Sequence, residues 1–176
     1  MELFILRHGE AGQRSASSAG DRKRPLTSTG KLEISEIAKA LKIIGLKFDL
    51  ILTSPLKRAY DTATILSKVF NIVKKVQVWD ELAPEGQKTD LYRKISGLKE
   101  EYIVLMVGHQ PLLGEIANDM IHKGKSSPCN LDLKKGGIMR IRLLTRGNVP
   151  RGELRWLMSP GSVSYTHLTL PTIYSV

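Results

Sequence analysis

Three short polar segments of the sequence carry side chains of types that can bind an anion or act as nucleophiles. Arg7-His8-Gly9-Glu10, Ser54-Pro55-Leu56-Lys57-Arg58-Ala59 and Gly108-His109-Gln110-Pro111 each follow a short apolar run. Guanidinium groups form planar, multiply hydrogen-bonded contacts with phosphate oxygens, and imidazoles serve as nucleophiles or as acids and bases. Gly9 would let the backbone pass close to a ligand beside His8. This set of side chains is suited to phosphoryl transfer.

The apolar runs before these segments are typical of buried strands. They comprise residues 2–6, 49–53 and 102–107, and longer segments of helical period lie between them. Short strands that alternate with helices predict an α/β domain, here a three-layer α/β/α sandwich around a mostly parallel central sheet. Ligands of such sheets bind outside the carboxyl ends of the strands. We therefore expect the three polar segments to face one edge of the sheet.

The helices of this fold are predicted from periodicity and from capping residues. They cover residues 28–44, 55–70, 90–98 and 111–122. Thr27 caps the first helix, whose apolar stripe consists of Ile34, Ile37, Ala38, Leu41 and Ile44. Pro55 and Pro111 would each occupy a first helical position, so that free N–H groups point at an anion.

The remaining segments predict three further strands and one long loop. The strands cover residues 73–79, 138–144 and 153–158, and the last two would form a hairpin across Arg146-Gly147-Asn148. The stretch between the first strand and Arg24 is rich in Gly, Ser and Ala, which is typical of a loop. This loop could be a basic rim that guides an acidic partner or a surface segment without a role in binding.

The length and composition predict one domain with a distinct tail. The chain has 176 residues, 41% of them hydrophobic, which suffices for one core over residues 1–158. Residues 159–176 contain no Lys, Arg, Asp or Glu, although 25% of the whole chain is charged. The ending VSYTHLTLPTIYSV resembles adapter-derived tails, and our hypothesis is that the native chain stops near Met158. A natural terminal extension is the alternative.

Charge and hydropathy argue against nucleic acid and membranes as partners. The net charge is +10, but the basic residues are scattered, without basic heptads or zinc-finger spacing. A protein that handles anionic phosphate or acidic partners has the same charge balance. No apolar run approaches the roughly 20 residues that span a bilayer, and no signal peptide precedes the first strand. Cys129 is the only cysteine, so no intramolecular disulfide is expected, and we predict a cytoplasmic protein.

Motifs for metals, nucleotides and acyl transfer are incomplete. His122 and His167 lack the companions of a metal site, so we expect neither a metal nor another cofactor. Gly124-Lys125-Ser126 lacks the earlier glycine and the preceding strand of a phosphate-binding loop. Ser54 and Lys57 have the spacing of a serine acyl-enzyme motif without its partner triplets, and we interpret Ser54 as a helix cap.

The three polar segments together resemble the motifs of a known superfamily. LRHGE near the start, SPLKRAYDTA and VGHQP are similar in order and spacing to those of the histidine phosphatase superfamily, which has the phosphoglycerate-mutase-like fold. The short chain, the absence of a large insertion between His8 and His109, and DELAPEG at 80–86 resemble its compact SixA-type branch of phosphohistidine phosphatases. The resemblance covers residues 1–158, which it implies are a histidine phosphatase domain.

The resemblance implies a role for each residue of the candidate site. His8 would be the nucleophile that takes the phosphoryl group, and Arg7, Arg58 and His109 would bind its oxygens beside Gly9. Glu81 would donate a proton to an alkoxide leaving group, although Asp80 and Glu85 are close enough in sequence to compete for this role.

The same resemblance implies hydrolysis of phosphohistidine on a protein partner, such as a histidine phosphotransfer domain, through a covalent phosphohistidine intermediate. An imidazole leaving group is less basic than an alkoxide, so this reaction depends less on a proton donor. Two alternatives stay open. One is a broad phosphomonoesterase of the same superfamily that acts on small phosphorylated molecules, and the other is a non-catalytic module that binds phosphate or a phosphoprotein.

Overall fold

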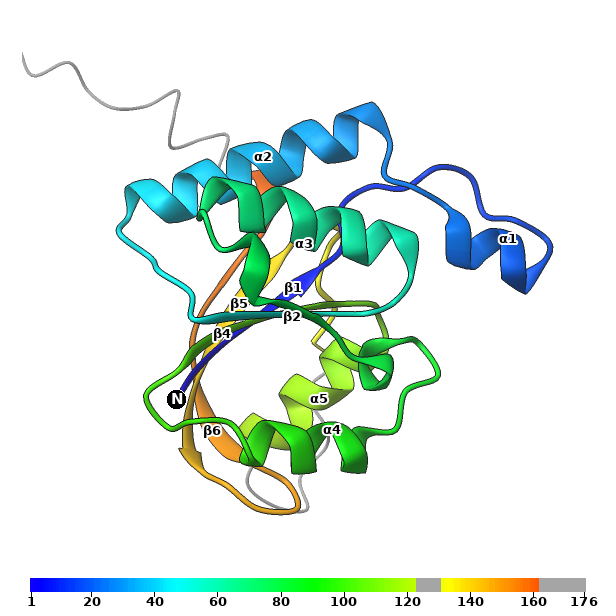
Figure 1. The fold of residues 1–176 in the computed structure, drawn as a ribbon. Coiled ribbons are helices and arrows are strands. Elements are labelled where there is room, and N and C mark those ends of the chain that lie inside the picture. The colour runs from blue at the N-terminus through cyan, green and yellow to red at the C-terminus, as the bar shows by residue number, and fades with distance from the viewer. Residues whose placement is uncertain (123–130, 162–176) are drawn as a thin grey trace, which may run out of the picture.

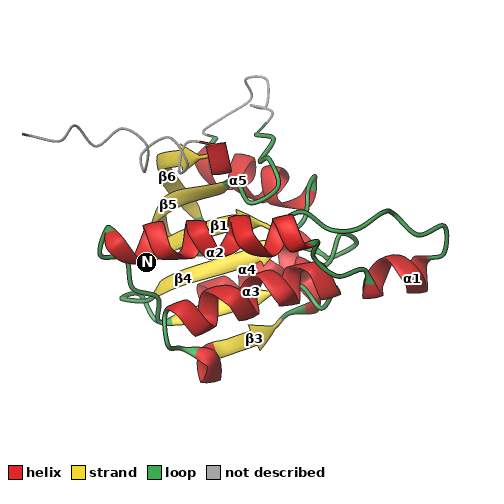
Figure 2. Cartoon of the chain, turned by 90° about the horizontal axis from the view of Figure 1, so that it is seen from above, coloured by secondary structure: helices red, strands yellow, loops and turns green. Residues whose placement is uncertain are grey.

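A six-stranded sheet with helices on both faces forms three layers in the computed structural model, which describes residues 1–122 and 131–161 (Figures 1 and 2). The strands are β1 (Glu2–Arg7), β2 (Leu50–Thr53), β3 (Val76–Val78), β4 (Ile103–Gly108), β5 (Ile138–Thr145) and β6 (Arg151–Met158). The helices are α1 (Ser18–Lys23), α2 (Ser28–Ile43), α3 (Lys57–Val69), α4 (Lys88–Ser96) and α5 (Leu112–Ile121), with single-turn 3-10 helices η1 (Val73–Lys75) and η2 (Asp80–Leu82).

The order of the strands confirms the predicted α/β/α sandwich with a mostly parallel sheet. The order across the sheet is β3-β2-β4-β1-β5-β6. The first four strands are parallel, and β5 and β6 are antiparallel to their neighbours. The β5–β6 pair is the predicted hairpin, so the turn at residues 146–150 was correctly placed.

Side chains that alternate along β1 build a separate core on each face of the sheet. Leu3 and Ile5 join the core that α4 and α5 cover, whereas Phe4 and Leu6 join the core under α2 and α3. All four side chains are at most 1% exposed. A strand buried on both faces is a nearly continuous apolar run, which is why β1 was visible in the sequence.

The register of the parallel strands brings the three polar segments to one edge. Arg7 pairs with Gly108 across β1 and β4, and Thr53 pairs with Val107 across β2 and β4. The residues that follow these pairs leave the sheet together. The amide of His8 donates to the carbonyl of Gly108 at 3.1 Å, which continues the ladder one residue beyond the strands.

The predicted loop up to Arg24 contains a short helix, so that prediction was wrong in part. α1 covers Ser18–Lys23 and lies beyond the carboxyl ends of the strands, away from the sheet (Figures 1 and 2). The hydroxyl of Ser17 caps it by accepting from the amide of Gly20 at 3.2 Å. None of its residues is buried, and a helix without an apolar face leaves no periodic signal in the sequence.

Neither proline occupies the first helical position that the sequence predicted. α3 begins at Lys57 rather than at Pro55, and its capping residue is Leu56, without a side-chain hydrogen bond. α5 begins at Leu112, with Pro111 in the capping position. Both prolines precede the first helical turn, and the periodicity of the apolar residues does not locate a helix start this closely.

The other predicted elements are present with shifted ends. β3 is shorter than predicted because η1 occupies its first residues, and α4 begins two residues early, at Lys88. Thr27 caps α2 as predicted, and its hydroxyl accepts from the amide of Gly30. Ile44 does not belong to the buried stripe, since it follows the helix and is 62% exposed.

Several predictions concern residues outside the two described ranges. They involve residues 124–126, Cys129, His167 and most of the uncharged tail. Within residues 1–122 and 131–161, every helix is too short or too polar to cross a bilayer.

Gly30→Ala should destabilise the fold, because the added methyl group would meet backbone. A Cβ at residue 30 would lie 2.2 Å from the carbonyl oxygen of Glu10, where α2 packs under the segment that follows His8. We expect a loss of about 1–3 kcal/mol in unfolding free energy, measured by urea denaturation. Gly12→Ala is the control, since a Cβ there has nothing within 4 Å. Equal stability of the two variants would contradict the expected clash.

Candidate active site

The structure brings His8, His109, Arg7 and Arg58 together at the carboxyl edge of the sheet. His8 and His109 follow β1 and β4, and their ring centroids are 4.9 Å apart. Both imidazoles are buried, with 7% and 2% of each residue exposed. Arg58, in the first turn of α3, is 5% exposed, and Arg7 at the end of β1 is half-buried. Two imidazoles and two guanidiniums therefore share one small site.

Hydrogen bonds fix the tautomer of His8. Its Nδ1 lies 2.7 Å from the carbonyl oxygen of Gly9, which can only accept, so Nδ1 carries the hydrogen. Its Nε2 accepts from Nε of Arg58 at 3.2 Å and holds the free electron pair. Nε2 is therefore the ring nitrogen with an electron pair available for attack, and it faces a guanidinium, a group that also binds phosphate oxygens.

Both imidazoles are uncharged at neutral pH. Burial is the main influence on the pKa of His8 and lowers it from 6.5 to about 4, assisted by the positive charges of Arg58 and Arg7 and opposed by the hydrogen bond to Gly9. Burial also lowers the pKa of His109, to about 2, and the neighbouring His8 and the arginines add to the effect. An imidazole in this state needs no proton removed before it can act as a nucleophile.

A serine hydroxyl orients the second histidine. Nε2 of His109 lies 2.9 Å from Oγ of Ser54, and that oxygen also accepts from the amide of Leu56 at 3.2 Å. Either Nε2 or Oγ can donate in this pair, depending on the tautomer of His109. Nδ1 of His109 is buried without a hydrogen-bond partner, so this nitrogen is left for a ligand.

Buried arginine donors gather beside these histidines. Nη1 of Arg7 donates to the carbonyl of Leu133 at 2.6 Å, while its Nε is buried without a hydrogen-bond partner. Nε of Arg24 is ion-paired with Oδ1 of Asp21 at 3.2 Å, and the charge of Arg24 lowers the pKa of both His8 and His109. Buried donors are nearly always satisfied, so the unpartnered Nε of Arg7 at this site favours an anionic ligand.

Gly9 lies in a tight space between the site and α2. A Cβ there would be 2.7 Å from Cγ1 of Ile34, and the amide of Gly9 donates to Oγ1 of Thr62 at 3.2 Å. The hydroxyl of Thr62 in turn donates to the carbonyl of Arg58 at 2.8 Å. Gly9 thus lets the segment after β1 approach α2 closely, in addition to the role predicted beside a ligand.

Glu81 is paired with a lysine rather than with the histidines. Its Oε1 lies 2.5 Å from Nζ of Lys94, and its Oε2 is buried without a hydrogen-bond partner. Burial raises the pKa of Glu81, but the hydrogen bond and charge of Lys94, with the residue's own backbone amide, outweigh it and leave the pKa below its ordinary value. Of its two competitors, Asp80 is exposed and Glu85 forms an ion pair with Arg22. The role of Glu81 as a proton donor stays a prediction.

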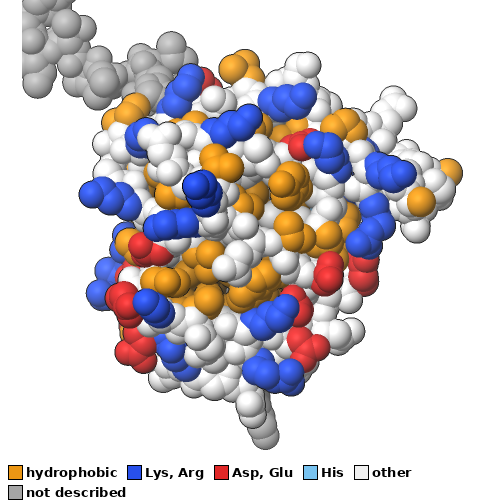
Figure 3. All heavy atoms as spheres, in the orientation of Figure 1, with side chains coloured by type: hydrophobic (Ala, Val, Ile, Leu, Met, Phe, Trp, Pro, Cys, Tyr) orange, Lys and Arg blue, Asp and Glu red, His pale blue; other side chains and the backbone are white. Residues whose placement is uncertain are grey.

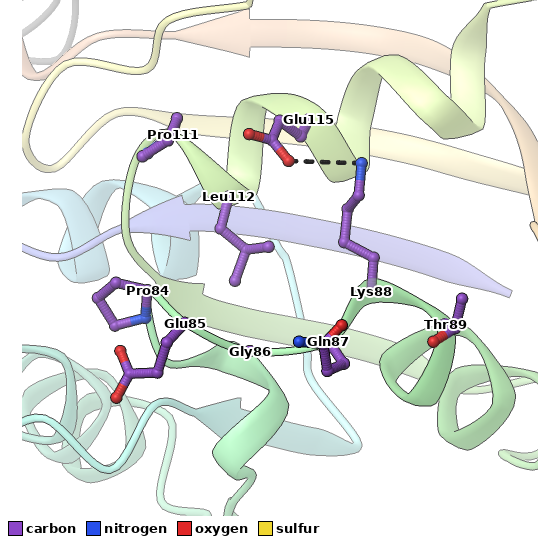
Figure 4. A pocket seen from close by; sticks show the side chains of 9 residues that line it. All are labelled: Pro84, Glu85, Gly86, Gln87, Lys88, Thr89, Pro111, Leu112 and Glu115. Atoms are coloured by element: carbon purple, nitrogen blue, oxygen red, sulfur yellow. Dashed lines mark ion pairs between the residues drawn. The ribbon is translucent and has the colours of Figure 1, made fainter.

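A cavity of about 300 Å³ lies beside the site (Figure 4). It is lined by residues 84–89 and by Pro111, Leu112 and Glu115, so its walls follow Glu81 on one side and His109 on the other. Nζ of Lys88 crosses it to Glu115 at 3.4 Å and also contacts Asp119 at 2.9 Å. Among the described residues, no group of three His, Cys, Asp or Glu side chains could hold a metal ion.

Sequence reasoning missed three residues of the site. Arg24 and Asp21 lie on the segment that was predicted to be a loop, and Thr62 lies inside α3. Thr62 is four residues after Arg58 and so lies on the same face of the helix, which was the one signal available. Arg24 was counted only among the scattered basic residues.

Comparisons with known proteins agree with this geometry. A sequence model described as histidine phosphatase superfamily (branch 1) matches residues 3–84. The phosphohistidine phosphatase SixA of Escherichia coli is 31% identical over 162 residues, which cover 91% of this chain and 94% of the relative. An uncharacterized protein of Picosynechococcus sp. is 40% identical over 144 residues, which cover 81% of this chain and 85% of that protein. The structure of the protein histidine phosphatase SixA with tungstate matches with a TM-score of 0.79 and 28% identity, over 93% of this chain and 99% of that chain.

The burial of two neutral histidines should make the fold sensitive to acid. Below about pH 6.5 the unfolded chain binds protons at both positions, whereas folded His8 resists protonation until about pH 4 and His109 until about pH 2. The unfolding free energy is therefore fully retained above pH 6.5 and falls as the pH decreases, with a slope approaching about 1.4 kcal/mol per pH unit for each histidine.

Urea denaturation between pH 7.5 and 5 measures this slope before most carboxylates titrate. Replacement of both histidines, His8→Asn with His109→Asn, should flatten the dependence, and each single variant should remove part of it. If the double variant keeps the wild-type slope, the acid sensitivity arises elsewhere.

Proposed function

Because the chain belongs to the histidine phosphatase superfamily and is a phosphatase, we propose that it hydrolyses phosphohistidine on a protein partner, with His8 as the nucleophile. The observation that carries the proposal is the state of His8: a buried, neutral imidazole with Nδ1 bonded to Gly9 and the electron pair of Nε2 facing Arg58. The similarity to SixA, whose name states phosphohistidine phosphatase, supports the choice of substrate.

In the first step, the electron pair of His8 Nε2 forms a bond to phosphorus as the bond between phosphorus and the substrate nitrogen breaks. The substrate ring carries a proton on its other nitrogen, so the electrons of the broken bond return to that ring and it leaves as a neutral imidazole. Positive charge develops on the His8 ring, and the hydrogen bond from Nδ1 to the carbonyl of Gly9 stabilises it. Arg58 gives up its hydrogen bond to Nε2 and turns to the phosphoryl oxygens, which Arg7 and His109 also bind.

In the second step, a water oxygen attacks phosphorus and loses a proton to solvent, while the bond from phosphorus to Nε2 breaks. Inorganic phosphate leaves and Nε2 recovers its electron pair. The same donors hold the phosphoryl oxygens in both steps, because charge lies on the same oxygens. Removal of one such donor costs on the order of 100-fold in rate.

The surroundings of Glu81 favour a leaving group that needs little help from an acid. The carboxylate is held by Lys94, and an ionised carboxylate cannot donate a proton to a departing alkoxide. A phosphohistidine substrate releases an imidazole, which is far less basic than an alkoxide. The pairing of Glu81 therefore handicaps phosphomonoester hydrolysis more than phosphohistidine hydrolysis.

Exposed basic residues favour an acidic protein partner. Arg14, Arg22 and Lys23 are exposed on the segment between β1 and α2, which contacts the site through Asp21. Other Lys and Arg side chains are spread over the face shown in Figure 3 without forming one patch. Positive charge around a site speeds the approach of negatively charged partners without fixing their identity.

The proposal predicts a covalent intermediate on His8 and a preference for phosphohistidine. Incubation with a phosphohistidine-containing phosphotransfer domain should label the protein with phosphate that is stable in alkali and lost in acid. His8→Asn should abolish both label and turnover, and Arg58→Ala should lower kcat/KM by about 100-fold. Comparison of kcat/KM for this substrate with that for an alkyl phosphate tests the preference.

Each alternative gives a different outcome in this experiment. A preference for the alkyl phosphate would overturn the proposed substrate. Affinity for the phosphoprotein without any label or turnover would identify a non-catalytic binding module.

The half-buried carboxylate of Glu81 favours a phosphomonoesterase as the second candidate function. Lys94→Met tests how far the ion pair with Lys94 lowers phosphomonoesterase activity. Without Lys94, the pKa of Glu81 should rise, because burial raises it and the hydrogen bond and charge that oppose burial are removed, so a larger share of the carboxyl is protonated at any given pH. We expect kcat/KM for an alkyl phosphate to rise by about threefold or more, while that for phosphohistidine stays within about twofold.

Lys99→Met is the matched control, because Lys99 lies over the ring of Tyr102 much as Lys94 lies over that of Trp79. An equal response of the two variants would show that Glu81 does not serve as a proton donor.

A further inference from the structure

Asp21, on the short helix α1, contacts the guanidinium that faces the nucleophile. Its backbone carbonyl accepts from Nη1 of Arg58 at 2.9 Å, and its Oδ2 lies 3.2 Å from the same nitrogen. Its other oxygen, Oδ1, lies 3.2 Å from Nε of Arg24. The side chain of Asp21 is 20% exposed and that of Arg58 is 6% exposed, so solvent screens this pair only in part.

These contacts determine which nitrogens of Arg58 are available for chemistry. Nη1 is held by Asp21, and Nε is directed at Nε2 of His8. Within residues 1–122 and 131–161, no protein group forms a hydrogen bond with Nη2. Because a guanidinium is planar and rigid, holding Nη1 sets the direction of the other two nitrogens.

We propose that Asp21 is a positioning residue, which anchors Nη1 of Arg58 so that, when Nε leaves Nε2 of His8, Nε and Nη2 meet the oxygens of the transferring phosphoryl group. The inference rests on the proposed function for the chemistry at His8 and goes beyond it by adding a residue that touches neither the nucleophile nor the substrate. Asp21 lies on a segment without helical periodicity, so no sequence pattern pointed to this role.

The attachment of α1 supports a role in positioning rather than in the core. α1 has no buried residue, and it is held by polar contacts between Asp21 and Arg58 and between Arg22 and Glu85 at 2.6 Å. A helix held in this way contributes little apolar burial to the fold. Among the described residues, Asp21 is therefore the residue of α1 that contacts one of the four residues gathered at the site, Arg58.

Asp21 also offsets positive charge at the site. Because of this charge, the loss of a positioning residue can be distinguished from general damage to the structure. Removal of Asp21 should misalign Arg58 and slow phosphoryl transfer, but it should strengthen the attraction of Arg58 and Arg24 for an anion. The expected signature is a lower kcat without weaker binding of phosphate. A site that is merely disordered would lose both.

The test uses p-nitrophenyl phosphate, whose leaving group needs no proton donor and no protein partner. We expect Asp21→Asn and Asp21→Ala to lower kcat by about tenfold, as a displaced guanidinium should. KM and the inhibition constants of inorganic phosphate and tungstate should be unchanged or lower. Thermal denaturation of each variant checks that the fold is retained.

Two control variants isolate the contact with Arg58. Asp61→Asn removes the same charge from α3, at a carboxylate that is 16% exposed and paired with Lys57, and should leave kcat within about twofold. Arg22→Ala releases the other polar contact of α1 and should likewise leave kcat unchanged if attachment of the helix alone is not what matters.

Each outcome decides the inference. If Asp21→Asn keeps the kcat of Asp61→Asn, or if it loses kcat and phosphate affinity together, Asp21 does not position Arg58. Turnover of p-nitrophenyl phosphate without turnover of phosphohistidine would overturn the proposed substrate and leave the inference standing. If the wild-type protein turns over neither compound, the proposed function fails and the inference fails with it.

Discussion

The parallel pairing of β1 with β4 is the constraint on which the site depends. Arg7 pairs with Gly108, and the next residue of each strand is a histidine, so the register sets the separation of His8 and His109. The amide of His8 still bonds to Gly108, which ties the first residue outside the sheet to the ladder. A shift of one residue along this pair would move one histidine relative to the other by about 3.3 Å and turn its side chain to the opposite face.

Burial at the carboxyl edge of the sheet disfavours the charged form of His8 and His109, and the proposed chemistry needs the neutral form of His8. A charged imidazole between guanidiniums would be unfavourable, so both histidines are held neutral near neutral pH, which is the state that the proposed attack by His8 requires. Backbone carbonyls and the carboxylates of Asp21 and Asp132 contact the two guanidiniums and offset their repulsion. The arrangement disfavours positive charge on His8 before a phosphoryl group arrives and favours the negative charge that the phosphoryl group carries.

The parts of the fold that bury apolar side chains were predictable from the sequence, and the polar attachments were not. Apolar runs revealed β1, β2 and β4, and the stripe on α2 was correct up to Leu41, because burial imposes periodicity. Apolar periodicity does not reveal which strands are neighbours in the sheet. The nearness of His8, Ser54 and His109 was therefore expected only from the rule that ligands bind at the carboxyl ends of the strands. α1 and the site contacts of Asp21 and Arg24 depend on hydrogen bonds between residues far apart in sequence, which no local pattern records.

The proposed reaction moves a phosphoryl group between two imidazoles, and this accounts for how little else the site contains. The bond that forms at His8 is chemically similar to the bond that breaks in phosphohistidine, so the first step needs alignment and charge stabilisation rather than strong acid catalysis. A proton donor would matter most for an alkoxide, and the candidate for that role, Glu81, is paired with Lys94. The proposed reaction then depends mainly on the orientation of Arg58. Its guanidinium must leave Nε2 of His8 and bind the phosphoryl oxygens in one step. A short helix with a single carboxylate aimed at that guanidinium meets this demand without adding to the core.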